Sequence, residues 1–376
     1  MALNEKESKI LSYIKENPFI SQQDLATKIG LSRPAVANII SGLVRRGYLL
    51  GKAYVINDTR PIVCIGAACI DRRYFVEGGL IHGQSNNVTS QTSIGGVALS
   101  IAENLGRLQE DVVMLSLVGD DAEWHTIEES MRPLMKTSEV EMVPGFSTGT
   151  FMEVIDESGK MIIGLAEMDI YEYMQPKWLL KHLATLKRAK TIIIDSNCPK
   201  ESVEHLLEIG AKYNIPVALV SASLLKLYNI PENLKGLKLL ITKHDETEKH
   251  FGIEIKDDAS LREALQLWMD QGVQHVIITR NSQSVGYASE KYGMHVYDLK
   301  NSDKDSDTYI WGTNEALCAG IVYSYLRTDD ISEMIQTGLV NAVMSSKSAY
   351  KVRPNLSQSV LRKDVKEIGK LESREI

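Results

Sequence analysis

The residues best suited to chemistry lie near the C-terminus, in the stretch 305–320, which reads DSDTYIWGTNEALCAG. Gly312 leads into small and apolar residues that predict the start of a helix. The first turn of a helix offers unpaired backbone N–H groups and a partial positive charge, which suit a phosphate or another anion. A carboxylate in that turn, here Glu315, could stabilise the helix or accept a proton. The stretch therefore suggests a phosphotransferase, or what remains of one.

The composition is that of a globular protein. With 376 residues the chain is too long for one ordinary small domain, and two or three domains are expected. No apolar run is long enough to span a bilayer, and the charged N-terminus lacks the apolar core of a signal peptide, so no membrane association is expected. The cysteines have neither metal-ligand spacing nor a disulfide pattern, which favours the cytoplasm and no direct metal site. They are Cys64, Cys69, Cys198 and Cys318.

Charge is unevenly distributed along the chain. Nine basic and five acidic residues give the first 60 residues a net charge of +4, so the remainder carries −11 of the total of −7. A basic head on an acidic body predicts that only the head meets a polyanion.

The head has the pattern of three short helices and a hairpin. Residues 5–16 have helical spacing, a second helix follows Ser21, and Ser32 caps a third. After Gly47, two short apolar runs flank residues 51–53, which have the size of a hairpin turn.

The stretch ISQQDLATKIGLSRPAVANIISGLVRRGYL resembles the winged helix-turn-helix of bacterial regulators. That resemblance implies that residues 32–46 form a recognition helix in the major groove of DNA, with Lys52 on a phosphate. Ser32, Arg33 and Asn38 are the candidate DNA-contacting residues of this helix. A winged domain used only for protein contacts is the alternative, but an outward face with Arg33 and Asn38 favours DNA.

The body alternates buried-strand patterns with amphipathic helices, such as 202–213 and 260–271. This alternation predicts an α/β fold with a mostly parallel sheet covered by helices on both faces. Residues 74–94 and 148–174 break the rhythm and are expected to form a small β lid. The strand patterns are at 62–65, 112–117, 191–194, 217–220, 237–241 and 275–278.

These patterns give four parts of the chain. We expect a winged helix-turn-helix domain at 1–57, a linker at 58–61, an α/β body at 62–365 and a C-terminal tail at 366–376.

The body resembles the PfkB, or ribokinase-like, family of carbohydrate kinases, with wording closest to the pseudouridine kinases. The resemblance implies a ribokinase-like αβα sandwich with a small β lid. It also implies transfer of phosphate from ATP, with Mg²⁺, to a hydroxyl group. The matching stretches are IGAACIDRRY (65–74), SIGGVALSIAENLGRL (93–108), STGTFMEVIDESGKMIIGLAEMDIYEYM (147–174) and GTNEALCAGIVY (312–323).

On the substrate side, the resemblance gives Asp71 the role of binding substrate hydroxyls. We expect its carboxylate to be exposed at a strand end, where pairing with a neighbouring arginine is the alternative role. Gly95 and Gly96 match the glycine pair that lets the backbone approach a sugar. Ser100 stands where the family has Asn, so it keeps a hydroxyl but loses the paired donor and acceptor of an amide. Altered recognition of a sugar is therefore expected.

On the nucleotide side, Glu246 matches the family residue that organises magnesium through water. Lys243 replaces the family's Asn, and either binds a phosphate or is a solvated surface lysine. Thr279 keeps its place in the nucleotide turn, but both glycines of that turn are replaced, so side chains project where bare backbone usually lies.

The opening stretch occupies the position of the family's D-x-T-G-A-G-D signature. The resemblance implies an anion hole at Gly312, Thr313 and Asn314, in which Asn314 is expected to tolerate the positive φ of the glycine it replaces. Glu315 stands in place of the catalytic Asp and carries its carboxylate one methylene further out. The first Asp of the signature is replaced by Tyr309, unless a shifted register uses Asp307 and Thr308.

Two hypotheses follow from these substitutions. The first is a DNA-binding transcriptional regulator whose body binds a sugar, nucleoside or phosphorylated small molecule, with weakened or lost kinase activity. The alternative is an active sugar or pseudouridine kinase that uses ATP and Mg²⁺ and also carries a DNA-binding head. A homodimer is expected in either case, because winged heads usually read paired half-sites.

Overall fold

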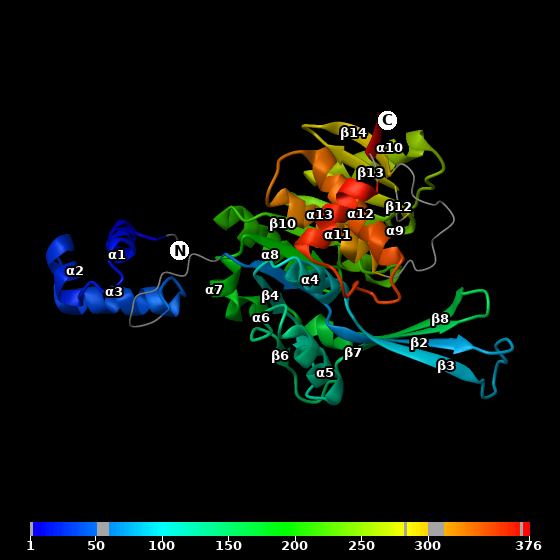
Figure 1. The fold of residues 1–376 in the computed structure, drawn as a ribbon, viewed down its shortest axis with the longest axis horizontal. Helices are drawn as coiled ribbons and strands as arrows, with labels where there is room; N and C mark the ends of the chain where they lie inside the picture. Colours follow the sequence, from blue (N-terminus) through cyan, green and yellow to red (C-terminus); the bar gives the residue numbers. More distant parts are fainter. Residues whose placement is uncertain (1–2, 51–59, 282–283, 300–311, 369–370) are drawn as a thin grey trace. The chain divides into compact units, whose positions relative to one another are not determined.

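The computed structural model describes residues 3–50, 60–281, 284–299, 312–368 and 371–376. The chain divides into two compact units, Met1–Arg60 and Pro61–Ile376, shown in Figure 1. Within the described residues, no helix has both the length and the apolar character needed to cross a membrane.

The first unit contains three helices, α1 (Glu5–Glu16), α2 (Gln22–Ile29) and α3 (Arg33–Arg45). Each begins at a polar N-cap whose side chain accepts a backbone N–H of the first turn, which stabilises the helix start. These N-caps are Asn4, Ser21 and Ser32. The predicted hairpin turn and Lys52 lie outside the described residues.

The second unit is built on a nine-stranded mixed sheet with the order β15-β14-β13-β12-β11-β10-β9-β1-β4. The strands from β4 to β12 are parallel, and the last three join antiparallel. The parallel strands are β4 (Val112–Leu115), β1 (Ile62–Ile65), β9 (Thr191–Asp195), β10 (Val217–Val220), β11 (Leu239–Lys243) and β12 (His275–Asn281). The antiparallel edge is formed by β13 (Ser284–Ser289), β14 (Gly293–Leu299) and β15 (Leu371–Glu375).

The C-terminal segment, expected to be a tail, adds a strand to this sheet instead. Residues of β15 pair with β14 in antiparallel register, and most of them are exposed at the sheet edge. A strand with little buried surface leaves only a weak hydrophobic pattern in the sequence, so the sequence does not predict a strand at 366–376.

Helices cover both faces of the sheet, as expected for this α/β pattern. Successive strand residues alternate between two buried clusters, one on each face. One face is covered by α4 (Val97–Arg107), α11 (Thr313–Tyr325), α12 (Ile331–Ser346) and α13 (Gln358–Glu367). The other is covered by α6 (Pro176–Lys181), α7 (Leu183–Leu186), α8 (Lys200–Tyr213), α9 (His244–Phe251) and α10 (Asp258–Asp270).

A separate four-stranded sheet forms the predicted lid and stands away from the main sheet (Figure 1). Its order is β3-β2-β7-β8, and all residues of its edge strand β8 are exposed. Its strands are β2 (Cys69–Val76), β3 (Val88–Gly95), β7 (Gly149–Ile155) and β8 (Met161–Glu167). The remaining elements are α5 (Ala122–Met131), the short pair β5 (Leu117–Val118) and β6 (Glu141–Met142), and the 3-10 turns η1 (Asp169–Tyr173) and η2 (Leu224–Asn229).

Candidate functional site

Asp71 and Glu315 lie on either side of one buried ammonium group, that of Lys351. The Nζ atom of Lys351 is 2.8 Å from Oδ2 of Asp71 and 3.9 Å from Oε1 of Glu315. Asp71 comes from β2 of the lid, Glu315 from the first turn of α11, and Lys351 from the segment after α12. Two predicted site residues are therefore brought together by a third that the sequence analysis did not identify.

Asp71 is buried rather than exposed, so that part of the expectation was wrong. Its exposed fraction is only 4 %, because β2 is an inner strand of the lid sheet. The neighbouring arginines have other partners: Arg72 pairs with Glu123 and Arg73 with Glu153. The second carboxylate oxygen of Asp71 accepts the Cys69 thiol at 3.3 Å.

The Lys351 side chain is charged. Burial by itself would lower its pKa, but the carboxylates of Asp71 and Glu315 outweigh that effect and raise the pKa above its usual value. Lys351 thus places a permanent positive charge between the two carboxylates at neutral pH. No periodicity or motif marks this lysine, which lies 36 residues after Glu315 in the chain.

The glycine pair is required by close packing around Asp71. A Cβ atom on Gly95 would lie 2.2 Å from Oδ1 of Asp71, and one on Gly96 would lie 2.1 Å from the carbonyl oxygen of Ala67. Gly96 also has φ +97°, which side chains rarely tolerate. Ser100 is buried on the next turn of α4. Among the described residues, no hydrogen bond joins its hydroxyl to Asp71.

A second residue that the sequence analysis missed, Asp195, joins the segment after β1 to the first turn of α4. It ends β9 and is fully buried, and it accepts the backbone N–H groups of Ala67 (3.0 Å) and Ala98 (2.9 Å). Burial raises the pKa of this carboxyl even though these hydrogen bonds act in the opposite direction. Its place at the carboxyl end of a buried strand was the available sequence signal.

The predicted anion hole lies at the N-terminus of α11. Gly312 is the N-cap with φ +76°, and a Cβ atom there would lie 2.2 Å from the carbonyl oxygen of Lys351. Thr313 and Asn314 begin the helix, so Asn314 does not adopt the positive φ that was expected for it. The left-handed conformation belongs to Gly312 instead. No side chain caps α11, which leaves this helix end suited to an external anion.

The predicted nucleotide-binding residues meet at the carboxyl ends of β11 and β12. Lys243 and Thr279 are direct partners in the register of these strands. Glu246 is 1 % exposed, contacts the Ser221 hydroxyl, and lies 3.4 Å from the Lys243 ammonium. Burial would lower the pKa of Lys243, but the carboxylates of Glu246 and Glu315 raise it.

The site is therefore a row of charges of alternating sign, Asp71, Lys351, Glu315, Lys243 and Glu246. Within the described part of the chain, no group of three or more His, Cys, Asp or Glu side chains could hold a metal ion. The row can bind a polar ligand between the lid and α11, but its carboxylates already have cationic partners.

The first unit presents a separate candidate surface on α3. Arg33 and Asn38 are exposed on this helix, as expected for residues that contact DNA. The Ser32 hydroxyl accepts the backbone N–H of Ala35 at 3.4 Å, so Ser32 has a structural role as the N-cap.

Comparison with known proteins gives a consistent answer for both units. Residues 59–352 match the pfkB family of carbohydrate kinases, and residues 3–49 match the winged helix-turn-helix DNA-binding family. The uncharacterized sugar kinase YeiI of Escherichia coli is 28 % identical over 356 residues, which cover 94 % of this chain and 97 % of that protein. Pseudouridine kinase of Escherichia coli is 23 % identical over 297 residues, covering 79 % of this chain and 93 % of that protein.

Solved structures agree on the fold. Arabidopsis thaliana ribokinase complexed with ribose and ATP superposes with a TM-score of 0.71 at 15 % identity, over 82 % of this chain and 99 % of that one. A putative sugar kinase from Clostridium perfringens gives 0.70 at 19 % identity, over 85 % and 99 %. The chain thus belongs to the pfkB family of carbohydrate kinases and carries a winged helix-turn-helix domain at its N-terminus.

Proposed function

We propose that this protein is a DNA-binding transcriptional regulator whose kinase-fold body binds a sugar, a nucleoside or a phosphorylated small molecule, and that its phosphoryl transfer is weak or absent. The observation that carries the proposal is the Lys351 ammonium, 2.8 Å from Asp71 and 3.9 Å from Glu315. In this family arrangement, Asp71 would bind the substrate hydroxyl and Glu315 would take its proton.

The lysine competes with both of these roles. A substrate hydroxyl that donates a hydrogen bond to Oδ2 of Asp71 must share that oxygen with the ammonium or displace it. Glu315 is also longer by one methylene than the family's Asp, and a misplacement of about 1 Å can cost on the order of a hundredfold in rate. Binding of a polar ligand tolerates such changes far better than turnover does.

The nucleotide side supports the same proposal. Lys243 and Glu246 form an ion pair, so the cation that lies beside this carboxylate is a lysine of the protein itself, while Oε2 of Glu246 contacts the Ser221 hydroxyl and Oε1 has no hydrogen-bond partner among the described residues. ATP and Mg²⁺ belong to this protein only if kinase activity persists.

The alternative is an active ATP-dependent sugar or pseudouridine kinase. Retention of Asp71, Gly95, Gly96 and a carboxylate at Glu315 favours it, as do the kinase names of the relatives. A regulator and a kinase differ in one measurable property, which is turnover.

The test uses the full-length protein with ATP, Mg²⁺ and either pseudouridine or ribose. We expect no turnover above background for the wild type, Glu315→Asp or Glu315→Gln. Wild-type turnover of about 1–100 per second, the ordinary kinase range, would overturn the proposal and establish the alternative.

A second arm tests regulation. DNA sequences that bind the full-length protein are selected from a random pool, and their affinity is measured with and without pseudouridine or ribose. An effector effect typically amounts to about 5- to 150-fold. Unchanged affinity with a sugar that demonstrably binds the body would refute the regulatory role.

The expected homodimer is part of this proposal. Strand β8 exposes Met161, Ile163 and Leu165 along one edge of the lid, with exposed fractions of 51, 40 and 51 %. An unpaired edge strand with apolar side chains favours association with a second copy.

A further inference from the structure

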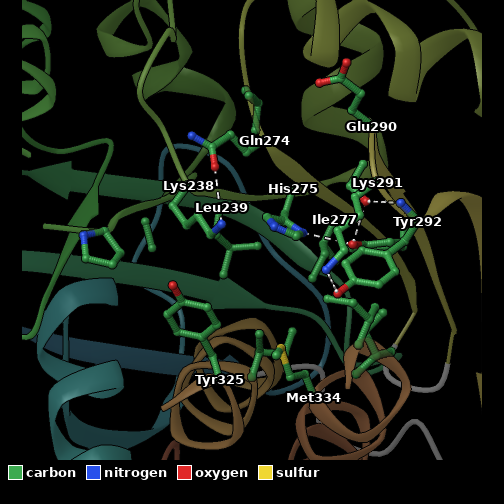
Figure 2. A pocket seen from close by; sticks show the side chains of 18 of the residues that line it. Lys238, Leu239, Gln274, His275, Ile277, Glu290, Lys291, Tyr292, Tyr325 and Met334 are labelled. Atoms are coloured by element: carbon green, nitrogen blue, oxygen red, sulfur yellow. Dashed lines mark hydrogen bonds between the residues drawn. The ribbon is translucent and has the colours of Figure 1, made fainter. Parts of the chain in front are cut away.

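A cavity of about 970 Å³ lies away from the Asp71–Glu315 site, at the amino-terminal edge of the main sheet (Figure 2). Its walls are the first residues of β9 to β12, the turn after β13, the last turns of α11 and the first turns of α12. The Asp71–Glu315 site lies at the other end of α11. The two sites therefore share a helix but no lining residue.

The cavity is mostly apolar. Leu239, Tyr325 and Ile331 belong to the core cluster on this face of the sheet, yet all three stay partly exposed. Leu239 lies in an inner strand between β10 and β12, where a side chain is normally covered completely. Its exposure indicates that the helices leave this part of the sheet uncovered. An apolar cavity of this size with a few polar groups is typical of small-molecule sites.

Two lysines, Lys238 and Lys291, supply positive charge to the cavity. Lys238 contacts the amide oxygen of Gln274 at 3.3 Å, and Lys291 contacts the hydroxyl of Tyr292 at 2.9 Å. The carboxylates of Glu290 and Asp329 also line the cavity, but among the described residues neither lies within salt-bridge distance of the two ammonium groups. Figure 2 shows the carboxylate of Glu290 directed away from the cavity centre.

His275 adds an uncharged polar group between the two lysines. Its Nδ1 atom is 2.9 Å from the hydroxyl of Tyr287, which donates its own proton to Ser289 at 2.9 Å. Burial, together with the charges of Lys238 and Lys291, lowers the pKa of His275 to about 4, so the ring is neutral at pH 7.

We infer that this cavity is a second ligand site, which binds an organic anion with a flat, apolar body. The apolar floor takes the body of the ligand, and Lys238 and Lys291 bind its carboxylate, sulfonate or phosphate group. The inference does not depend on the proposed function, because an active kinase and a regulator would carry the same cavity.

The test uses 8-anilinonaphthalene-1-sulfonate, a flat aromatic anion, titrated by fluorescence into the full-length protein. We expect one saturable site per chain, and binding at least about tenfold weaker for the analogue without the sulfonate, N-phenyl-1-naphthylamine. ATP, ribose or pseudouridine does not displace the dye at any concentration, which separates this cavity from the Asp71–Glu315 site.

Variants locate the site. Leu239→Trp fills the cavity and should abolish binding, whereas Leu225→Trp, at a position that is 74 % exposed elsewhere, should not. Lys238→Ala should weaken binding several-fold, while Lys235→Ala, at an exposed lysine outside the cavity, should have no effect.

A further variant keeps the test valid if Leu239→Trp does not fold. Tyr325→Asp places a like charge on a partly exposed wall position and should also repel the anion. Equal affinity in Tyr325→Asp and the wild type, displacement by ATP, or equal binding of the neutral analogue would each overturn the inference.

Discussion

Replacement of Lys351 by Met tests the charge arrangement of the site most directly. Methionine keeps much of the length of the side chain but removes the ammonium that lies between Asp71 and Glu315. These two carboxylates are only 4 and 9 % exposed, so the variant leaves buried negative charge without the Lys351 cation.

The size of the effect follows from the geometry. Removing one partner of a buried ion pair typically costs about 3–5 kcal/mol. Asp71 keeps its contact with the Cys69 thiol, and Glu315 is the more distant partner at 3.9 Å, which favours the lower end of that range. A loss of about 3 kcal/mol corresponds to a fall of about 6 °C in the melting temperature of the body, at about 2 °C per kcal/mol for a large domain.

The assay is differential scanning calorimetry of the full-length protein, in which the head and the body can melt separately. Lys347→Met, at an exposed lysine four residues earlier, is the control and should change stability by no more than about 0.5 kcal/mol. Asp71→Asn combined with Lys351→Met should recover most of the loss, because the pair is removed together.

Two results would refute this reasoning. One is a melting temperature of Lys351→Met equal to that of the wild type, and the other is a double variant that loses the sum of the two single losses. The pH dependence of the unfolding free energy is a further check, and its sign is defined. Because the folded pKa of Lys351 is raised, its stabilising effect is present below its unfolded pKa near 10.5 and is lost as the pH rises through the folded value.

Three other predictions concern the head, the cavity and the lid. Arg33→Ala and Asn38→Ala should each cost about 1–3 kcal/mol of binding free energy at a specific DNA site, whereas Lys52→Ala should weaken binding to all sequences and reduce its salt dependence. Equal losses for every sequence in all three variants would exclude base reading by helix α3. Because the pKa of His275 is lowered, the native state loses stability as the pH falls from about 6.5 to about 4, by less than about 3 kcal/mol for a partly exposed ring. His275→Gln should remove this part of the pH dependence of the unfolding free energy measured in urea. Leu165→Lys on β8 should shift a dimer toward monomer in sedimentation velocity, and an unchanged sedimentation coefficient would exclude the lid edge as the interface.

The fold was largely predictable because its signals are local. The inner parallel strands are continuous apolar runs. The lid strands are short segments of alternating residue character, so both patterns can be recognised in the sequence. β15 lacks such a pattern, because an exposed edge strand buries few of its side chains.

The site was predictable only in part. Asp71 and Glu315 lie in family motifs, and the structure places both beside the same ammonium. Lys351 lies in no motif, and its role depends on the packing of α12 against α11, which brings its segment over Gly312. The burial of Asp71 and the helical conformation of Asn314 likewise depend on tertiary contacts that a one-dimensional pattern does not contain.

Helix α11 has a thermodynamic consequence of its own. It is 13 residues long, about 20 Å at 1.5 Å per residue, with Glu315 in its first turn and Tyr325 at its other end. At its middle, Gly320 packs so closely against Gly338 of α12 that a Cβ atom would lie 2.8 Å from the Cα atom of Gly338, which leaves the helix little room to bend. Any ligand that displaces one end of such a helix also changes the other. Reciprocity then requires that any factor by which an anion in the cavity changes the dissociation constant of a sugar beside Asp71 is also the factor by which the sugar changes that of the anion, so measuring either one predicts the other.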